Sequence, residues 1–261
     1  MADQWQSIVL TGASSGIGLA LARRLAAPGV RMLLIGRDAT RLDPVAAEVA
    51  AAGGEAHCVA ADIADGAAMR AALHDFDGKK AVDLVIANAG ISAGLEPGAM
   101  PEAAGVAEHL VSVNLMGMIN TIEPLLPEMI ARGRGQIALV SSLAAMNPHP
   151  DMPSYSATKA AVRAYGIAMR ASMRAHGVSV SVICPGFVTS PMSARHDGIK
   201  PFEMPAERAA EIIARGLARR QAFITFPWPL VLLGWLGNRL PPRLSDRLLE
   251  GFRARILPDE R

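Results

Sequence analysis

The sequence has few cysteines, few aromatic residues and little excess of charge, and these shortages exclude several classes of protein. Only Cys58 and Cys184 occur in 261 residues, which excludes a disulfide scaffold and a cysteine-rich zinc site. Both lie in apolar runs, so we expect two buried thiols in a reducing compartment. Lys and Arg outnumber Asp and Glu by only 26 to 24, so the charge does not indicate a nucleic-acid-binding protein.

Long apolar runs are also missing. The longest, 226–236, is interrupted by two prolines and a glycine, whereas a membrane-spanning helix needs about twenty apolar residues. The first six residues are polar and show no secretory signal. We therefore expect a soluble, cytoplasmic protein, and its 51% of hydrophobic residues is ample for a large core.

Short β-branched runs alternate with longer runs rich in Ala, Leu and Arg. The expected strands are 7–11, 31–36, 55–60, 82–87, 136–141, 178–184 and 222–225. The expected helices are 18–27, 40–52, 66–76, 104–132, 154–176 and 206–219. The first six strands are almost continuously apolar, as parallel strands buried on both faces are. This alternation predicts a single α/β domain over 1–261, a doubly wound parallel sheet (Rossmann fold) with helices on both faces.

A glycine-rich turn at 11–18 follows the first strand and opens the first helix. Its glycines, Gly12, Gly16 and Gly18, have the spacing G-x-x-x-G-x-G. Glycine lets the backbone approach a ligand closely, and a helix N-terminus offers free N–H groups to a pyrophosphate. Many strand–helix junctions need glycine for packing alone, but the place of this turn in an alternating chain favours a dinucleotide.

The residue after the second expected strand bears on the choice of dinucleotide. An acidic residue there accepts hydrogen bonds from the adenine ribose and favours NAD. Here Arg37 takes that place, and a guanidinium pairs well with a 2′-phosphate. Asp38 is better explained as the N-cap of the next helix. We expect NADP rather than NAD, with a solvated loop charge as the alternative interpretation of Arg37.

Three polar residues near the fifth expected strand form a candidate catalytic group. Tyr155 and Lys159 are four residues apart, so they share one face of a helix. A nearby cation is expected to lower the tyrosine pKa from about 10, as a general acid/base near neutral pH requires. Ser142 follows the strand at the edge where such sheets bind ligands, and strand alternation directs Ser141 to the other face. A chance Tyr–Lys pair on one helix remains the alternative.

Together the motifs resemble those of the short-chain dehydrogenase/reductase family, main type of roughly 250 residues. The matching positions are Thr11–Gly18, Asp62, Asn88-Ala89-Gly90, Asn114, Ser142, Tyr155, Lys159, Pro185-Gly186 and Thr189. Their order and spacing agree over residues 7–190, about seventy per cent of the chain.

The resemblance implies a role for each of these positions. Tyr155 would exchange the proton of the substrate oxygen, Ser142 would orient that oxygen, and Lys159 would bind the nicotinamide ribose. Asn114 would hold the backbone of its own helix and a water of a proton relay, or simply satisfy backbone groups in a kinked helix. The cofactor would contact Gly12, Ser14, Ser15, Gly16, Ile17, Gly18, Arg37, Asp62, Ile63, Asn88, Ala89, Gly90, Tyr155, Lys159, Pro185, Gly186, Val188 and Thr189.

The implied activity is that of an NADP-dependent oxidoreductase acting on a carbonyl or alcohol. The substrate loop would span 187–205, where Met192, Met204, His196 and Phe202 favour an apolar or mixed small molecule. We expect no metal site, because His149 and His196 have no ligand-like spacing. A non-catalytic dinucleotide-binding regulator, or an epimerase or dehydratase with the same cofactor site, is the alternative.

The C-terminal extension, 226–261, is unusually apolar. A helical pattern would align Leu244, Leu248, Leu249, Phe252 and Ile256 on one face. From residue 205 onward ten Arg stand against six Asp and Glu. The extension is interpreted as a cap over the substrate cleft, a subunit interface or a peripheral membrane contact. Packing on its own domain or on another subunit is favoured, and we expect a homodimer or homotetramer.

Overall fold

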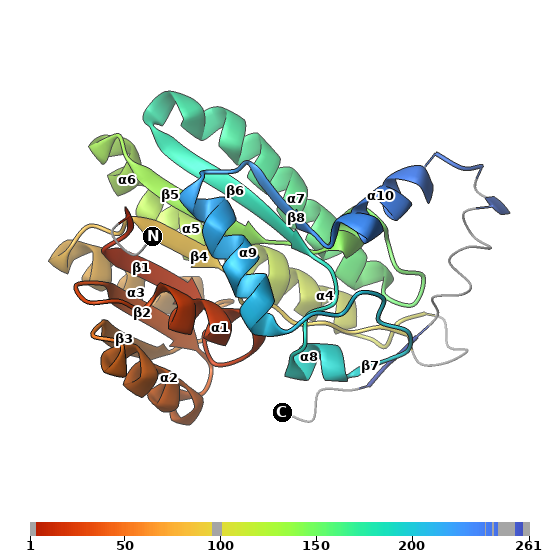
Figure 1. Ribbon diagram of the computed structural model, residues 1–261, viewed down its shortest axis with the longest axis horizontal. Helices are drawn as coiled ribbons and strands as arrows, with labels where there is room; N and C mark the ends of the chain where they lie inside the picture. Colours follow the sequence, from red (N-terminus) through yellow and green to blue (C-terminus); the bar gives the residue numbers. More distant parts are fainter. Residues whose placement is uncertain (1–3, 96–100, 238, 242, 245–253, 258–261) are drawn as a thin grey trace.

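Seven parallel strands form the central sheet of the computed structural model, which describes residues 4–95, 101–237, 239–241, 243–244 and 254–257 (Figure 1). The strands are β1 (Ser7–Thr11), β2 (Arg31–Gly36), β3 (Glu55–Ala60), β4 (Leu84–Ala87), β5 (Gly135–Val140), β6 (Val178–Pro185) and β8 (Phe223–Phe226). Their order in the sheet is β3-β2-β1-β4-β5-β6-β8. The predicted doubly wound α/β fold is confirmed, and the strand order reverses between β1 and β4, where such sheets bind ligands.

Helices cover both faces of the sheet (Figure 1). They are α1 (Gly16–Leu25), α2 (Ala39–Ala51), α3 (Gly66–Lys79), α4 (Val106–Val111), α5 (Gly117–Ile122), α6 (Leu126–Arg132), α7 (Pro153–Met173), α8 (Pro191–Ala194), α9 (Ala206–Ala218) and α10 (Trp228–Gly237). Because successive strand residues point to opposite faces, Leu10 packs in one core cluster with α1, α2 and α9. Val9 packs in the other cluster, with α3, α5 and α7.

The long helix expected over 104–132 is broken into several pieces. A π-helical turn, Ser112–Met116, separates α4 from α5, and a 3₁₀ turn, Glu123–Leu125, separates α5 from α6. Pro124 lies in the 3₁₀ turn, where its missing N–H removes an α-helical hydrogen bond. A π turn inserts an extra residue into the helix, and here it carries the buried Asn114.

Two expectations about burial are wrong. β3 is an edge strand that pairs only with β2 among the described strands, and its residues are exposed or half-buried rather than covered on both faces. Cys58 lies on this strand and is exposed, so only Cys184 is the buried thiol that was expected. An apolar run alone does not distinguish an edge strand from a central one.

The C-terminal extension is described only in part. After α10, residues 239–241, 243–244 and 254–257 are described, and β9 (Arg255–Ile256) pairs antiparallel with β7 (His196–Asp197) of the substrate loop. The expected helix face at Leu248, Leu249 and Phe252 lies outside the described residues. No described helix combines the length and the apolar content that crossing a membrane requires.

The glycine-rich turn is closely packed against the segment that follows β4. Gly12 and Gly16 have φ values of +66° and +52°, which residues with a side chain rarely adopt. A Cβ on Gly18 would lie 2.0 Å from the Gly12 carbonyl oxygen and 2.7 Å from the Asn88 side-chain nitrogen. The first turn of α1 can therefore approach the turn only because residue 18 is glycine.

We expect Gly18→Ala to lower the free energy of unfolding by about 2–3 kcal/mol, because the added methyl group must displace backbone. Gly78→Ala is the matched control, since a Cβ there meets nothing within 4 Å and the residue lies in α3. That control should be neutral or stabilising by up to about 1 kcal/mol. Urea unfolding of both variants measures the difference, and equal midpoints would contradict the packing argument.

Candidate active site

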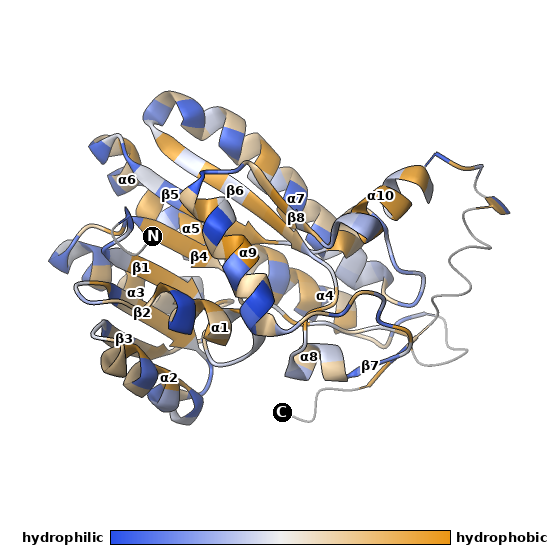
Figure 2. Cartoon of the chain, viewed as in Figure 1, coloured by the Kyte–Doolittle hydropathy of each residue, from blue (hydrophilic) through white to orange (hydrophobic). Residues whose placement is uncertain are grey.

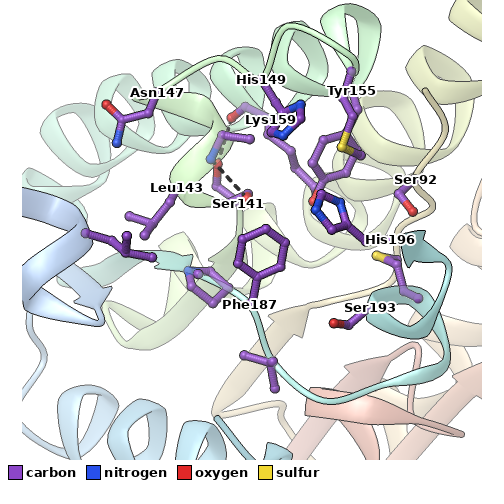
Figure 3. Close-up of a pocket in the computed structure, with 18 of the residues that line it drawn as sticks. Ser92, Ser141, Leu143, Asn147, His149, Tyr155, Lys159, Phe187, Ser193 and His196 are labelled. Atoms are coloured by element: carbon purple, nitrogen blue, oxygen red, sulfur yellow. Dashed lines mark hydrogen bonds between the residues drawn. The ribbon is translucent and has the colours of Figure 1, made fainter. Parts of the chain in front are cut away.

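A cavity of about 590 Å³ lies at the carboxyl ends of β1, β4, β5 and β6. The glycine-rich turn forms one end, and the substrate loop and α10 form the opposite walls. Figure 3 shows Tyr155, Lys159, Phe187 and His196 around this space. Four strand ends far apart in the sequence thus contribute to one site.

Ser142 and Tyr155 are neighbours on the cavity wall, close enough for the serine hydroxyl to lower the pKa of the phenol. Ser142 directly follows β5, and its Oγ also accepts a hydrogen bond from the N–H of Ala144 at 3.1 Å. Tyr155 lies in the first turn of α7, which begins at Pro153. Burial raises the pKa of the Tyr155 phenol, and the Ser142 hydroxyl opposes that rise.

Lys159 lies one turn beyond Tyr155 and is only 5% exposed. Its Nζ donates to the Val140 carbonyl at 3.1 Å and lies 5.8 Å from the centroid of the Tyr155 ring. Burial lowers the pKa of Lys159 to about 8. The expected lowering of the Tyr155 pKa is therefore wrong for this arrangement, because burial disfavours the charged form of both groups.

Ser141 and Asn114 both make hydrogen bonds that hold the frame of the site. The Ser141 hydroxyl donates to the Lys159 carbonyl at 2.7 Å, and Ser141 lines the cavity together with Ser142, so the expected separation of the two serines onto opposite faces does not keep Ser141 away from the site. The Asn114 amide accepts from Ile91 N at 2.8 Å and donates to Ile91 O and Thr158 Oγ1. The expectation that this side chain holds its own helix is wrong, since it joins the loop after β4 to α7.

Asn88 holds the glycine-rich turn in place. Its side-chain nitrogen donates to the carbonyls of Thr11 and Gly12 at 3.0 and 3.3 Å. The Thr11 hydroxyl accepts from the N–H groups of Asn88 and Ala89, both at 3.1 Å. Asn88 therefore lines the cavity and also braces the turn, a structural role beside the expected contact with the cofactor.

The expected cofactor residues divide between the cavity wall and its surroundings. Those on the wall are Gly12, Ser15, Gly16, Ile17, Asn88, Ala89, Gly90, Tyr155, Lys159, Pro185, Gly186 and Val188. Ser14, Gly18, Arg37, Asp62, Ile63 and Thr189 are not among the described residues that line it, and neither is the catalytic candidate Asn114.

The residues outside the wall have identifiable local roles. Arg37 is exposed directly after β2, and Asp38 accepts from Thr40 N at 2.9 Å as the expected N-cap of α2. Asp62 accepts from Ala64 N at 2.9 Å. The Thr189 hydroxyl donates to the Met204 carbonyl at 3.3 Å, which closes the substrate loop on itself.

The substrate loop brings two histidines together. His149 and His196 lie edge to face with ring centroids 5.6 Å apart, and both line the cavity. The Phe187 ring also contacts His196, with the ring centroids 4.8 Å apart and the two planes tilted by 56°. Sequence spacing could not show this pair, because the fold alone makes them neighbours. The described residues contain no group of three or more His, Cys, Asp or Glu arranged to hold a metal ion.

Sequence reasoning did not identify several residues at the site. Ser92, Asn147 and Met152 line the cavity but belong to no motif. The inner residues of α10 and Ile256 of β9 also line it, although the sequence identified the extension only as a whole. Thr158, the partner of Asn114, lies inside the Tyr–Lys motif, and only the fold shows its role.

Comparisons with known proteins agree with this geometry. A family model described as short chain dehydrogenase matches residues 6–198. An uncharacterized oxidoreductase of Myxococcus xanthus is 33% identical over 243 residues, covering 93% of this chain and 95% of the relative.

Solved structures show the same fold. A short chain dehydrogenase/reductase of Burkholderia phymatum in complex with NAD has a TM-score of 0.80 at 23% identity, and the match covers 100% of this chain and 99% of that one. A short-chain dehydrogenase of Sphingobium yanoikuyae in complex with NADPH has a TM-score of 0.75 at 24% identity, covering 90% and 96%.

Lys159→Met should stabilise the protein at pH 7. A lysine pKa lowered from 10.5 to about 8 means that the folded chain bears the full cost of a buried charge below pH 8. That cost, at most about 3 kcal/mol, is relieved as the pH rises from about 8 to above 10. In urea unfolding without added cofactor, the variant should therefore have a higher free energy of unfolding than the parent at pH 7, and this difference should be smaller at pH 9.5.

The exposed Lys79 provides the control, because Lys79→Met removes a charge that pairs with Asp75 in solvent. Its effect on the free energy of unfolding should be small at pH 7. If Lys159→Met raised the free energy of unfolding by the same amount at pH 7 and pH 9.5, the buried charge of Lys159 would not explain the stabilisation.

Proposed function

The chain belongs to the short-chain dehydrogenase/reductase family, and from this premise we propose that it transfers a hydride between NADP and the carbonyl or alcohol group of an apolar small molecule. At the level of the family it is an NAD(P)-dependent oxidoreductase acting on alcohol or carbonyl groups. The preference for NADP, the substrate class and the residue roles below form the proposal.

The observation that carries the proposal is the Ser142–Tyr155 pair on the cavity wall, with Lys159 one helical turn away. In the direction of reduction, the Tyr155 hydroxyl donates its proton to the substrate oxygen. Ser142 hydrogen-bonds the same oxygen and holds it near the phenol. When bound, the nicotinamide supplies or accepts the hydride.

The glycine-rich turn fits a dinucleotide pyrophosphate. Gly12 and Gly16 have positive φ values, and Ser15 makes no side-chain capping bond to the described first turn of α1. The N–H groups at that helix end are therefore open toward the cavity, together with the positive end of the helix dipole. Lys159, one helical turn beyond Tyr155, holds the nicotinamide ribose.

Asn114 serves as a positioning residue in this proposal. Its amide fixes Ile91 beside the cavity and Thr158 within α7, and the Thr158 hydroxyl donates to the Tyr155 carbonyl at 2.8 Å. The first turn of α7 is thereby held against the loop after β4. A water-borne proton relay past Asn114 stays a prediction.

The preference for NADP rests on Arg37. It is the exposed residue at the carboxyl end of β2, where an acidic side chain would favour the ribose hydroxyls of NAD. An exposed guanidinium reaches a 2′-phosphate without first breaking a buried contact. Proteins of this fold differ in the dinucleotide they bind, since one of the two solved structures above holds NAD and the other NADPH.

The wall of the cavity supports an apolar substrate. Leu143, Met152, Phe187, Met192 and Ile256 surround the space beyond Tyr155. A methionine side chain adapts to varied apolar shapes, which suits a loop that must close on a ligand. A homodimer or homotetramer and a cytoplasmic location also stay predictions.

Tyr155→Phe removes the proton donor without removing the ring. Turnover of a reactive ketone with NADPH should fall by about a hundredfold or more, while NADPH affinity measured by fluorescence changes little. Tyr165→Phe is the matched control on the same helix and should retain turnover within about twofold. Near-normal turnover in Tyr155→Phe would refute the assignment of the proton donor.

Arg37→Asp should invert the order of cofactors. A carboxylate repels the 2′-phosphate and accepts from free ribose hydroxyls, so the ratio of kcat/KM with NADPH to that with NADH should fall by about a hundredfold. Arg134→Asp is the control, because Arg134 is exposed just before the amino end of β5, whereas Arg37 follows the carboxyl end of β2. Equal use of NADH and NADPH by the parent enzyme would overturn the preference.

A further inference from the structure

Helix α10 has apolar residues on two opposite faces. Leu230, Leu233, Gly234 and Gly237 recur at helical spacing and line the cavity. Trp228, Leu232 and Trp235 recur with the same period on the other side, and none of them is among the described residues that line the cavity. A helix of this kind is normally buried or placed against lipid, and ten residues are too few to span a bilayer.

The outer face, formed by Trp228, Leu232 and Trp235, is open to the surroundings. The exposed fractions of these residues are 72%, 48% and 52%. Figure 2 shows α10 at one side of the molecule, where the orange of its leucines and valine alternates with paler residues. Burying large apolar side chains is a main source of stability, so an exposed set of this size indicates an interaction surface.

The open end of the cavity lies on the same side. Leu233 and Leu236 of α10 line the cavity and are also about half exposed, at 51% and 49%. Leu240 and Ile199 share both properties. The rim of the cavity is therefore apolar and continuous with the outer face of α10.

The charged residues of the segment that carries this surface have one sign. Arg239 and Arg243 are the only charged residues between positions 227 and 244. The Arg239 guanidinium lies 3.4 Å from the centroid of the Trp235 ring and donates to the Trp235 carbonyl at 2.9 Å. Tryptophan beside arginine at the border of an apolar surface is typical of the membrane interface.

A second copy of the chain fits this charge pattern poorly. A two-fold contact centred on α10 brings the same patch of each subunit together. Arg239 and Arg243 would then face their own counterparts, and residues 227–244 contain no carboxylate to pair with them. An anionic lipid surface offers apolar depth for the tryptophans and phosphates for the arginines.

We propose that α10 docks the enzyme on an anionic membrane surface, with the outer face in the interfacial layer and the cavity rim opening toward the lipid. An apolar substrate dissolved in the bilayer then reaches Tyr155 along an apolar path. The docking itself does not depend on the proposed catalytic roles.

Intrinsic fluorescence tests the docking directly, because Trp5 is 4% exposed while the other two tryptophans are on or beside the outer face. Full-length protein is mixed with vesicles of phosphatidylcholine alone or with phosphatidylglycerol. We expect flotation with the anionic vesicles and a shift of tryptophan emission to shorter wavelength. Equal flotation with both vesicles, or with neither, would overturn the proposal.

Two double variants, each with a control, separate the apolar and the charged contributions to vesicle binding. Leu232→Glu/Trp235→Glu should lower the vesicle-bound fraction at least tenfold, and Leu232→Met/Trp235→Phe should retain it. Arg239→Gln/Arg243→Gln should weaken binding to anionic vesicles about tenfold. Its control is Arg41→Gln/Arg70→Gln on α2 and α3, far from α10 in Figure 1.

Light scattering and circular dichroism complete the test. The glutamate variant should keep the mass in solution and the helical signal of the parent. A parent oligomer that dissociates in that variant, together with no vesicle binding by the parent, would assign the outer face to a subunit interface and overturn the proposal. Vesicle binding that persists in both the glutamate and the glutamine variants would also overturn the proposal.

Discussion

The site depends on the contact between the turn after β1 and the segment after β4, where Asn88 occupies the space that a side chain on residue 18 would fill. The Asn88 amide holds the carbonyls of Thr11 and Gly12, while the Thr11 hydroxyl holds two N–H groups of the β4 segment. These hydrogen bonds are partly buried, and several of them act on the same short segments, so together they hold the two segments against each other. The glycine-rich turn is thus fixed relative to the centre of the sheet.

Through Asn114, the same segment is also linked to α7. Ile91 follows Asn88 by three residues and is held by both polar atoms of Asn114, whose amide also reaches Thr158. Thr158 in turn bonds the carbonyl of Tyr155. Asn114 can serve both neighbours because it lies in the π turn between α4 and α5, where the extra residue changes which side chains face the core. The glycine-rich turn, the segment after β4 and α7 are therefore linked by one set of hydrogen bonds.

Features that depend on local pattern could be predicted from the sequence. The first three strands begin and end at the expected residues, and Asp38 caps α2, because apolar runs and capping side chains act over a few residues. The Tyr155–Lys159 spacing likewise needs only helical geometry. The edge position of β3, the partners of Asn114 and the His149–His196 contact could not be predicted, since each depends on which distant element lies alongside. The two apolar faces of α10 show the same limit, because the sequence gives their composition but not their surroundings.

The apolar wall of the cavity has a further consequence for the chemistry. Burial in this wall raises the pKa of Tyr155 and lowers that of Lys159, because a charge is costly in a site shielded from water. A phenolate and an ammonium formed together compensate each other, so their combined cost is less than the sum of the two separate charges. Tyr155 is consequently protonated throughout the neutral range, which is the form that the proposed proton donor needs for reduction. Under the same proposal, oxidation of an alcohol would begin from the phenolate, which burial disfavours, so it would need a higher pH than reduction.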